Sequence, residues 1–369
     1  MEFRFRNVND AFRSMVKVFS GNDPRLARST SRVGDVLYIQ EPVIITYTHP
    51  REKVLFNQAR DCNPFFHVYE ALWMLAGRND IAGPSYYAAN YRECVQDGDS
   101  PTANGAYGYR WRHARSARRG SLEQTRYETE EDQLKPIVKH LKDKPDSRRV
   151  VLQMWNVEDD LLKVDSTKDC CCNLCALFSL RTEMSQVEPY MAHRRLDMTV
   201  YNRSNDLIWG TLGANAVHFA FLQEYLAACL GVEVGVYNQI SNNQHVYVNR
   251  FEPEKWLTDQ TIDRYLLASQ NRKSLHTVPL VQDPITFDRE CAEFVERHSK
   301  DALAGYYTEP FLRDVAQPMC ISFHQHRHHD YGDALNAAEY ILADDWRIAS
   351  VNWLLKRKAA YERKHAENV

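Results

Sequence analysis

The sequence predicts an α+β domain, a layered arrangement of helices and sheets, in place of a doubly wound nucleotide-binding fold. Helix and strand signals are mixed along the chain without a strict strand–helix–strand repeat. The chain has 369 residues and is 44% hydrophobic, which is enough for one large core with a smaller attached part. We therefore expect a main domain over residues 1–254, and a mainly helical C-terminal extension or subdomain over residues 255–369.

The first clear elements are two strands and a helix. Residues 33–48 are rich in β-branched and aromatic residues and are interrupted at Pro42, which predicts two strands joined by a turn. We expect the core to begin there. Residues 63–76 open with Asn63 and a proline, which are favoured at the N-cap and first helical positions, and stop before Gly77. This segment predicts a helix of about four turns.

The middle of the chain first becomes polar and then returns to core-like patterns. Residues 113–133 carry many charges of both signs with almost no apolar periodicity, which predicts a solvated loop. The amphipathic stretch from Leu134 to Leu141 predicts a helix, and residues 150–155 and 174–180 predict strands.

Two further elements follow. Residues 196–201 alternate apolar and polar side chains, which is typical of a half-buried strand. Residues 215–230 predict a second helix that ends before Gly231.

Composition excludes several classes of function. The formal net charge of -3 provides no global field for nucleic acid or an anionic membrane. No apolar run approaches the roughly 20 residues that span a bilayer, and the N-terminus does not begin a signal peptide, so we expect a cytoplasmic protein. Nine cysteines are present, but the consecutive run from Cys170 to Cys172 does not resemble a disulfide framework, and reduced thiols are expected.

A carboxylate on the first predicted helix is a candidate acid or base. Glu70 lies on a helix that is apolar nearly all round, apart from His67. A buried carboxylate must be paired, protonated or functional, because burying it unpaired costs several kcal/mol. It is therefore either a general acid/base with a raised pKa or a structural residue that bonds a backbone group or an arginine.

Arginines and cysteines provide two weaker signals. Arg148, Arg149 and Arg203 stand at the ends of predicted strands, where guanidinium groups suit a phosphate, although solvated arginines are also common there. The Cys170–Cys175 segment enters a strand from a polar loop. Its thiols could act as a nucleophile, bind zinc, or be buried without a chemical role, and the spacing alone does not decide among these alternatives.

Taken in order, these segments resemble the thymidylate synthase family and its pyrimidine hydroxymethylase relatives. The matching motifs are YEALW (69–73), GAYGYRWR (105–112), DQL (132–134), PDSRRVVLQMWN (145–156), CNLCALF (172–178), RSND (203–206), the turn 210–215 and HVY (245–247). The resemblance implies a thymidylate synthase-like fold, a catalytic main domain and a homodimer. It also implies methylene-tetrahydrofolate as co-substrate and a pyrimidine nucleoside monophosphate as substrate.

The resemblance also implies roles for individual residues. Cys172 would add to C6 of the pyrimidine, and Glu70 would manage protons and order water. The phosphate would be held by Arg203 and Ser204, by Arg148 and Arg149 from the other subunit, and by Arg32. The remaining contacts would come from His245 and Tyr247 to the sugar, Asp206 and Gly210 to the folate, Asn215 to the base edge, and Tyr107 in the pocket wall.

Departures from the usual synthases favour a hydroxymethyl product. No tryptophan lies between Trp73 and Trp111, where synthases usually place one against the methylene intermediate, so water could capture that intermediate instead of hydride. Asn215 favours uracil at the base site. Cytosine remains an alternative base for two reasons. The deoxycytidylate hydroxymethylases of this family resemble this sequence but have Asp at this position, and a flipped Asn amide would present the opposite hydrogen-bonding polarity to the base. Hydroxymethylation of dUMP is therefore preferred, and dCMP, CMP or reductive methylation are alternatives.

Two functions from other classes fit the sequence less well. An inactive relative that binds nucleotide or RNA is disfavoured by the presence of Cys172, Glu70 and the arginines. A metal site is suggested by the histidines at positions 324, 326, 328 and 329, which are more often a solvated cluster, so no metal is expected.

Overall fold

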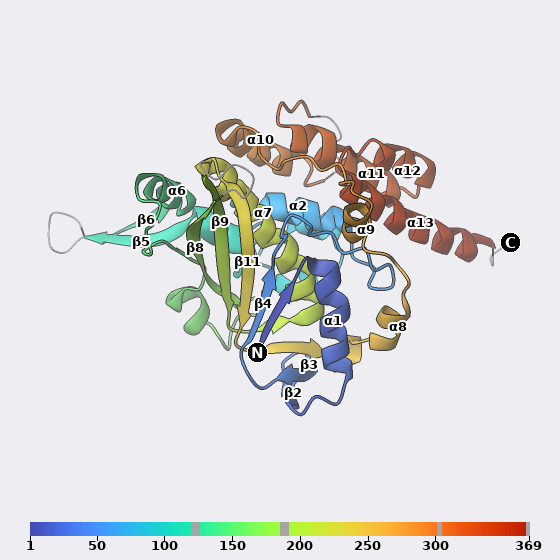
Figure 1. Cartoon of the computed structure of the whole chain (residues 1–369), viewed down its shortest axis with the longest axis horizontal. Helices are drawn as coiled ribbons and strands as arrows, with labels where there is room; N and C mark the ends of the chain where they lie inside the picture. The colour runs from blue at the N-terminus through green and yellow to red at the C-terminus, as the bar shows by residue number, and fades with distance from the viewer. Residues whose placement is uncertain (120–125, 185–191, 301–304, 367–369) are drawn as a thin grey trace.

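A mixed β-sheet forms the centre of the molecule, which is described by a computed structural model over residues 1–119, 126–184, 192–300 and 305–366. Within these residues the strand order is β1-β4-β11-β9-β8-β7 (Figure 1). The strands are β1 (Glu2–Phe5), β4 (Val43–Tyr47), β7 (Val151–Gln153), β8 (Asn173–Met184), β9 (Ala192–Asn202) and β11 (Glu233–Ser241). The pairs β1/β4 and β9/β11 are parallel and the others are antiparallel, so the predicted α+β class is confirmed.

A second, smaller sheet continues from the first. It has the order β10-β12-β3-β2, with strands β2 (Leu26–Ser31), β3 (Gly34–Ile39), β10 (Asn205–Asp206) and β12 (Gln244–Tyr247). The chain leaves β9 at Asn202 and enters β10 at Asn205, so Arg203 and Ser204 lie at the junction of the two sheets. The two strands predicted around Pro42 are β3 and β4.

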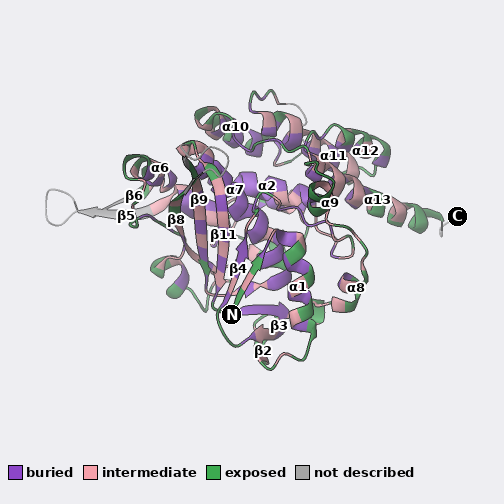
Figure 2. Cartoon of the chain, in the orientation of Figure 1, coloured by how far each residue is buried: buried purple, intermediate pink, exposed green. Residues whose placement is uncertain are grey.

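The two helices predicted with defined ends are confirmed. Helix α2 (Pro64–Leu75) is capped by the Asn63 side chain, which accepts a hydrogen bond from the backbone N–H of Phe66 at 3.1 Å. Helix α7 (Asn215–Leu230) ends at Gly231, whose φ of 69° is a conformation that glycine adopts at little cost. Both helices are buried almost all round, as Figure 2 shows, because α7 packs between α2 and the sheet strands β9 and β11.

The core begins earlier than expected. Helix α1 (Val8–Ser20) precedes the first predicted strand, and Asn7 caps it by accepting from the backbone N–H groups of its first turn. Phe12 and Phe19 on its inner face are each only 2% exposed. The prediction that the core starts at residue 33 was therefore wrong, because the amphipathic α1 already contributes buried aromatic side chains to it.

The polar stretch 113–133 is also not the loop that was expected. Strands β5 (Ala114–Arg119) and β6 (Arg126–Glu131) pair antiparallel, and Figure 1 shows this ribbon extending away from the main body. A hairpin that projects from the core needs no apolar alternation, because its backbone groups satisfy one another. The lack of apolar alternation explains why the hydrophobic period of the sequence did not predict the β5–β6 hairpin.

The remaining helices cover the sheet and the end of α2. They are α3 (Ala82–Tyr87), α4 (Tyr91–Val95), α5 (Tyr107–Arg112), α6 (Leu134–Asp143), α8 (Pro253–Thr258), α9 (Arg264–Gln270), α10 (Pro284–Arg297), α11 (Gln317–Arg327), α12 (Tyr331–Glu339) and α13 (Asp344–Ala366). The chain after residue 254 is mainly helical, and α10, α11 and α13 pack directly on α2. Phe65 of α2, for example, lies 5.4 Å from the rings of both Phe323 and Trp353. The domain boundary at residue 254 stays a prediction.

Among the described residues, no helix combines the length and the apolar character that crossing a membrane would require.

Candidate active site

A cavity of about 590 Å³ opens at the junction of the two sheets. Its wall contains many of the residues selected from the sequence, namely Arg32, Tyr107, Cys172, Arg203, Ser204, Asp206, His245 and Tyr247. Other lining residues, including Val36, Val164, Thr167, Lys168, Asp169, Cys170 and Asn243, were not selected. The fold therefore brings two thiols, two arginines, a histidine and two carboxylates to one cavity.

Arg203 holds the loop that carries the thiol. Its Nε donates to the carbonyl of Cys171 and its Nη2 to the carbonyl of Cys170, each at 2.8 Å. The same Nη2 lies 3.6 Å from Cys172 Sγ. Nη1 of Arg203 has no acceptor among the described residues, so this side of the guanidinium can still hold an anion.

The cysteines of the loop have different surroundings. Burial raises the pKa of the Cys172 thiol, and the Arg203 charge opposes this rise. Cys171 is 1% exposed, burial raises its pKa well above the usual value, and its Sγ donates to the carbonyl of Asn173 at 2.9 Å. Of these cysteines, Cys170 and Cys172 line the cavity. Cys172 Sγ lies 3.6 Å from Arg203 Nη2, and the Arg203 charge also opposes the rise that burial causes in the pKa of the Cys170 thiol.

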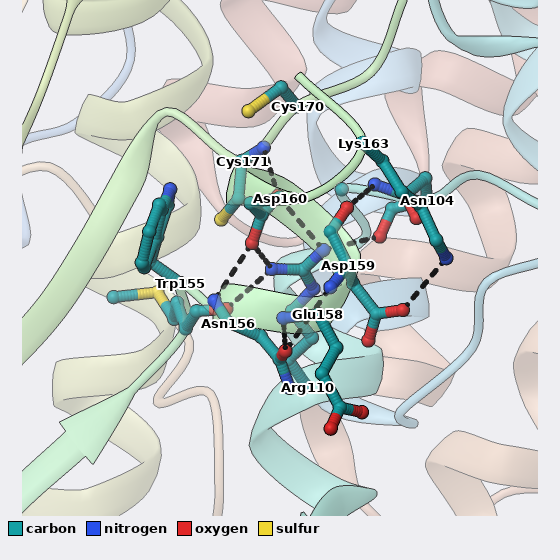
Figure 3. A network of polar contacts seen from close by, with 12 residues as sticks. Asn104, Arg110, Trp155, Asn156, Glu158, Asp159, Asp160, Lys163, Cys170 and Cys171 are labelled. Atoms are coloured by element: carbon teal, nitrogen blue, oxygen red, sulfur yellow. Dashed lines mark hydrogen bonds and ion pairs between the residues drawn. The ribbon is translucent and has the colours of Figure 1, made fainter. Parts of the chain in front are cut away.

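A buried ion pair fixes the position of the same loop (Figure 3). Asp160 is fully buried, pairs with Arg110, and accepts the backbone N–H of Cys171 at 2.8 Å and that of Asn156 at 2.8 Å. Arg110 also donates to the carbonyls of Met154 and Asn104. Burial alone would raise the pKa of Asp160, but Arg110 and the backbone donors lower it overall. The carboxylate is therefore charged and anchors the cysteine loop through the backbone N–H of Cys171.

The cavity wall also contains a histidine and a carboxylate, and the charge of each acts on the other. His245 Nδ1 lies 3.0 Å from Asn243 Oδ1, and its ring is 5.2 Å from that of Tyr247 in an edge-on arrangement. Asp206 accepts the backbone N–H of Trp209. Burial raises the pKa of Asp206 and lowers that of His245, and each charge opposes the other's shift. These groups offer donors and acceptors to a polar ligand.

Asp169 is a lining residue that the sequence analysis missed. Its Oδ2 accepts the backbone N–H of Gly105 at 2.7 Å, and burial raises its pKa to about 6. Gly105 allows this approach, because a Cβ there would lie 2.7 Å from Asp169 Oδ1. The one available signal was its position three residues before Cys172 in a polar loop.

Glu70 lies on α2, near this region but not in the wall of the cavity. It is 9% exposed, and its Oε2 lies 3.0 Å from His218 Nε2 on α7. Burial and the neighbouring His218 hold the pKa of His67, one turn away, at about 3, so that imidazole is neutral. The expected buried carboxylate is thus present, with a histidine partner that the sequence did not reveal.

The other selected residues also lie outside the lining. Asn215 is 8% exposed at the start of α7, and its Nδ2 donates to Asn205 Oδ1 at 3.1 Å. Gly210 lies beside this pair, since a Cβ there would be 2.3 Å from Asn205 Oδ1. Arg148 and Arg149 are exposed ahead of β7 and do not reach the cavity of their own chain.

The histidine-rich segment has contacts that do not resemble a metal site. His324 Nδ1 lies 3.0 Å from the Tyr86 hydroxyl, and the rings of His329 and Tyr361 stack at 4.9 Å. Within the described part of the chain, no group of three or more His, Cys, Asp or Glu side chains is arranged to hold a metal ion.

Known proteins are similar in sequence to this chain. Residues 57–278 match the thymidylate synthase family model. A deoxyuridylate hydroxymethyltransferase of Pseudomonas phage M6 is 38% identical over 352 residues, which are 92% of this chain and 90% of that protein. A deoxyuridylate hydroxymethyltransferase of Bacillus phage SP01 is 37% identical over 63% of this chain and 59% of its own length. The chain belongs to the thymidylate synthase family.

Proposed function

We propose that this protein transfers a one-carbon group from methylene-tetrahydrofolate to C5 of dUMP and releases 5-hydroxymethyl-dUMP. The observation that carries this proposal is the Cys172 thiol beside the Arg203 guanidinium in a cavity lined by His245 and Tyr247. The relatives named for deoxyuridylate hydroxymethylation support the choice of base and product.

The nucleophile follows from the chemistry of the ring. C5 of an unmodified pyrimidine is a poor nucleophile, and addition of a thiolate at C6 converts it into an enamine-like carbon. The positive charge of Arg203 favours the thiolate form of Cys172 against the opposing effect of burial. Arg203 donates a hydrogen bond to the loop and Asp160 accepts one from it, and these bonds hold the sulfur in one place. Little orientational freedom therefore has to be lost when the ring binds.

The residues around Asp206 fit a folate. A pterin presents several N–H donors, and the Asp206 carboxylate lines the cavity as an acceptor. Trp209, three residues away, is 48% exposed and lies under the Arg60 guanidinium at 4.2 Å, which provides a flat surface and a cation for a ligand with aromatic and carboxylate parts. When bound, the folate supplies one carbon at the oxidation level of formaldehyde.

Glu70 is proposed to move protons during the same reaction. Its carboxylate lies 3.0 Å from His218 Nε2, and its helix α2 packs against α7, α10, α11 and α13. A group in this position can accept or return a proton through ordered water without lining the cavity itself. Asn215 is proposed to read the base edge, with its Nδ2 already oriented by Asn205.

A second copy of the chain is proposed to complete the phosphate site. Helix α7 covers one face of the main sheet, whereas on the other face Tyr201 is 36% exposed and Val151 is 48% exposed. An open, partly apolar sheet face suits a partner of the same kind. Arg148 and Arg149 stand exposed ahead of β7, where they can reach the cavity of a partner while Arg32, Arg203 and Ser204 act within their own chain.

Subunit complementation tests this arrangement. Cys172→Ala and Arg149→Ala proteins should each be inactive, and a refolded mixture should recover about a quarter of the wild-type activity, since half of the random dimers carry one intact site. A mixture that stays inactive, or a monomer by light scattering, would contradict the shared site. Mixing either variant with an Arg149→Ala/Cys172→Ala double variant provides the matched control, which should recover nothing.

One assay tests the reaction itself. The protein is incubated with methylene-tetrahydrofolate and each of dUMP, dCMP and CMP, and the product is identified by mass together with near-ultraviolet absorbance. Hydroxymethylation leaves tetrahydrofolate and adds CH₂O to the nucleotide. Methylation instead produces dihydrofolate, with a rise in absorbance, and would show a thymidylate synthase or methyltransferase activity. Turnover of dCMP or CMP but not dUMP would overturn the choice of base.

A further inference from the structure

Asp169 is a carboxylate that lines the cavity together with the proposed nucleophile, Cys172. Asp169 and Cys172 are three residues apart in one loop and line the same cavity. The charge of Asp169 acts on Cys172, since it raises the pKa of that thiol. When a pyrimidine is bonded to Cys172 through C6, the transferred carbon is attached to the adjacent ring atom, C5. A side chain near the sulfur is therefore also near the transferred carbon.

The loop holds this carboxylate in a defined orientation. Gly105 donates to Oδ2, Asn104 Nδ2 donates to the backbone carbonyl of Asp169 at 3.0 Å, and Asp169 N–H donates to Thr167 Oγ1 at 3.2 Å. Asp97 in turn accepts from the Thr167 hydroxyl and from the backbone N–H of Lys168. Oδ1 of Asp169 has no donor among the described residues, so one oxygen is fixed and the other is available.

We propose that Asp169 is the base that activates the water which captures the one-carbon group. This inference rests on the proposed hydroxymethylation. After tetrahydrofolate leaves, the nucleotide is bonded to Cys172 and carries an exocyclic methylene on C5. Asp169 removes a proton from water as the oxygen bonds to that methylene, and the electron pair moves to O4. The enolate then reforms the C5–C6 double bond and expels the Cys172 thiolate. The proton rests on Asp169 until it exchanges with solvent.

Glu70 is less suited to this step, because it pairs with His218 and does not line the cavity. A carboxylate in the cavity wall also accounts for the choice of water over hydride, since a charged side chain retains water that an apolar wall would exclude. The charged or titratable groups acting on Asp169 are Arg110, which opposes protonation, and Asp97 and Asp160, which favour it. The charge of Asp169 in turn raises the pKa of Cys172, Tyr107 and Tyr91.

A single-turnover experiment separates water capture from the earlier steps. Enzyme in excess is mixed with methylene-tetrahydrofolate and dUMP labelled with tritium at C5. Tritium release reports the steps up to removal of the hydrogen from C5, which precedes the exocyclic methylene, and hydroxymethyl-dUMP reports completed capture by water. For Asp169→Asn we expect tritium release at the wild-type rate and hydroxymethyl product about 100-fold slower. Added 2-mercaptoethanol should then trap the accumulated intermediate as a thioether of dUMP.

Asp165→Asn is the matched control, because Asp165 is an exposed aspartate of the same loop that does not line the cavity. It should behave as wild type in both readouts. Equal losses of tritium release and product in Asp169→Asn, or a full rate of hydroxymethyl product, would overturn the role of Asp169. Wild-type protein that releases no tritium from dUMP, or that forms a methyl product, would instead overturn the proposed function, and this inference with it.

Discussion

The Nη2 atom of Arg203 lies 3.6 Å from Cys172 Sγ and at the same time donates to the carbonyl of Cys170. One guanidinium therefore acts on the thiol's charge and on the position of its loop. Replacing Arg203 by Gln should raise the pKa of the Cys172 thiol further, because burial then acts unopposed by this cation. Alkylation of Cys172 by iodoacetamide, followed by peptide mass spectrometry at pH 8, should slow about tenfold.

Arg181→Gln is the control for this variant, because Arg181 is an exposed arginine paired with Asp197 at 2.9 Å. It should leave the alkylation rate unchanged. An unchanged rate in Arg203→Gln would show that the guanidinium does not influence the thiol.

The Arg110–Asp160 pair should contribute to stability as well as to loop position. Asp160→Ala leaves a buried guanidinium without its partner and should lower the free energy of unfolding by about 3 kcal/mol. Glu252→Ala removes an exposed pair with Lys255 and should cost at most about 0.5 kcal/mol. Urea unfolding followed by tryptophan fluorescence measures both. Equal losses in the two variants would contradict the assigned role.

The pH dependence of this contribution has a definite sign. The pKa of Asp160 is lowered in the folded state, so the pair stabilises the protein above the ordinary carboxylate pKa of 3.8 and loses that effect as pH falls through the lowered value. The difference in unfolding free energy between wild type and Asp160→Asn should therefore be constant near neutral pH and shrink only in acid.

Glu70→Gln should suppress the early proton transfers. We expect tritium release from labelled dUMP to fall about 100-fold, because an amide cannot accept a proton. The contact with His218 at 3.0 Å can be retained by the amide, so the melting temperature should change little. A large fall in melting temperature with tritium release intact would identify Glu70 as structural. The expected loss of tritium release in Glu70→Gln contrasts with Asp169→Asn, in which tritium release is expected at the wild-type rate.

Asn215→Asp tests how the base is selected. Asn215 now donates through Nδ2 to Asn205 Oδ1, and a carboxylate there would require the Asn205 amide to turn away from Gln239 and Ser241. The kcat/KM for dUMP should fall at least about 100-fold, because uracil O4 loses its donor. Turnover of dCMP, compared with dUMP in one competition assay, should rise. An unchanged ratio of the two products would exclude Asn215 as the residue that reads the base.

Capture of water should depend on pH through Asp169. Burial raises the pKa of this carboxyl to about 6, and a base must be deprotonated to act. The ratio of hydroxymethyl product to released tritium should therefore rise as pH increases through about 6 and level off above it. The ratio should be independent of pH in Asp169→Asn.

The sequence alone determined much of this protein. Capping residues and hydrophobic period located α2, α7 and most central strands, because those signals are local. Ordered motifs identified the family, and with it Cys172, Arg203 and His245 as residues of one site. Local signals could not show the β5–β6 hairpin, since its pairing depends on backbone hydrogen bonds between segments without an apolar face.

Only the tertiary structure decided which groups meet. The loop from Asp160 to Cys172 has no periodicity, and its shape depends on Arg110, Arg203 and Asp97, which come from distant parts of the chain. The partnership of Glu70 with His218 likewise requires α2 and α7 to pack together. Contacts between residues far apart in sequence follow from packing and burial, and burial is also what raises the pKa of Asp169. A residue that looks like an ordinary loop aspartate in the sequence thereby becomes a candidate base beside the nucleophile.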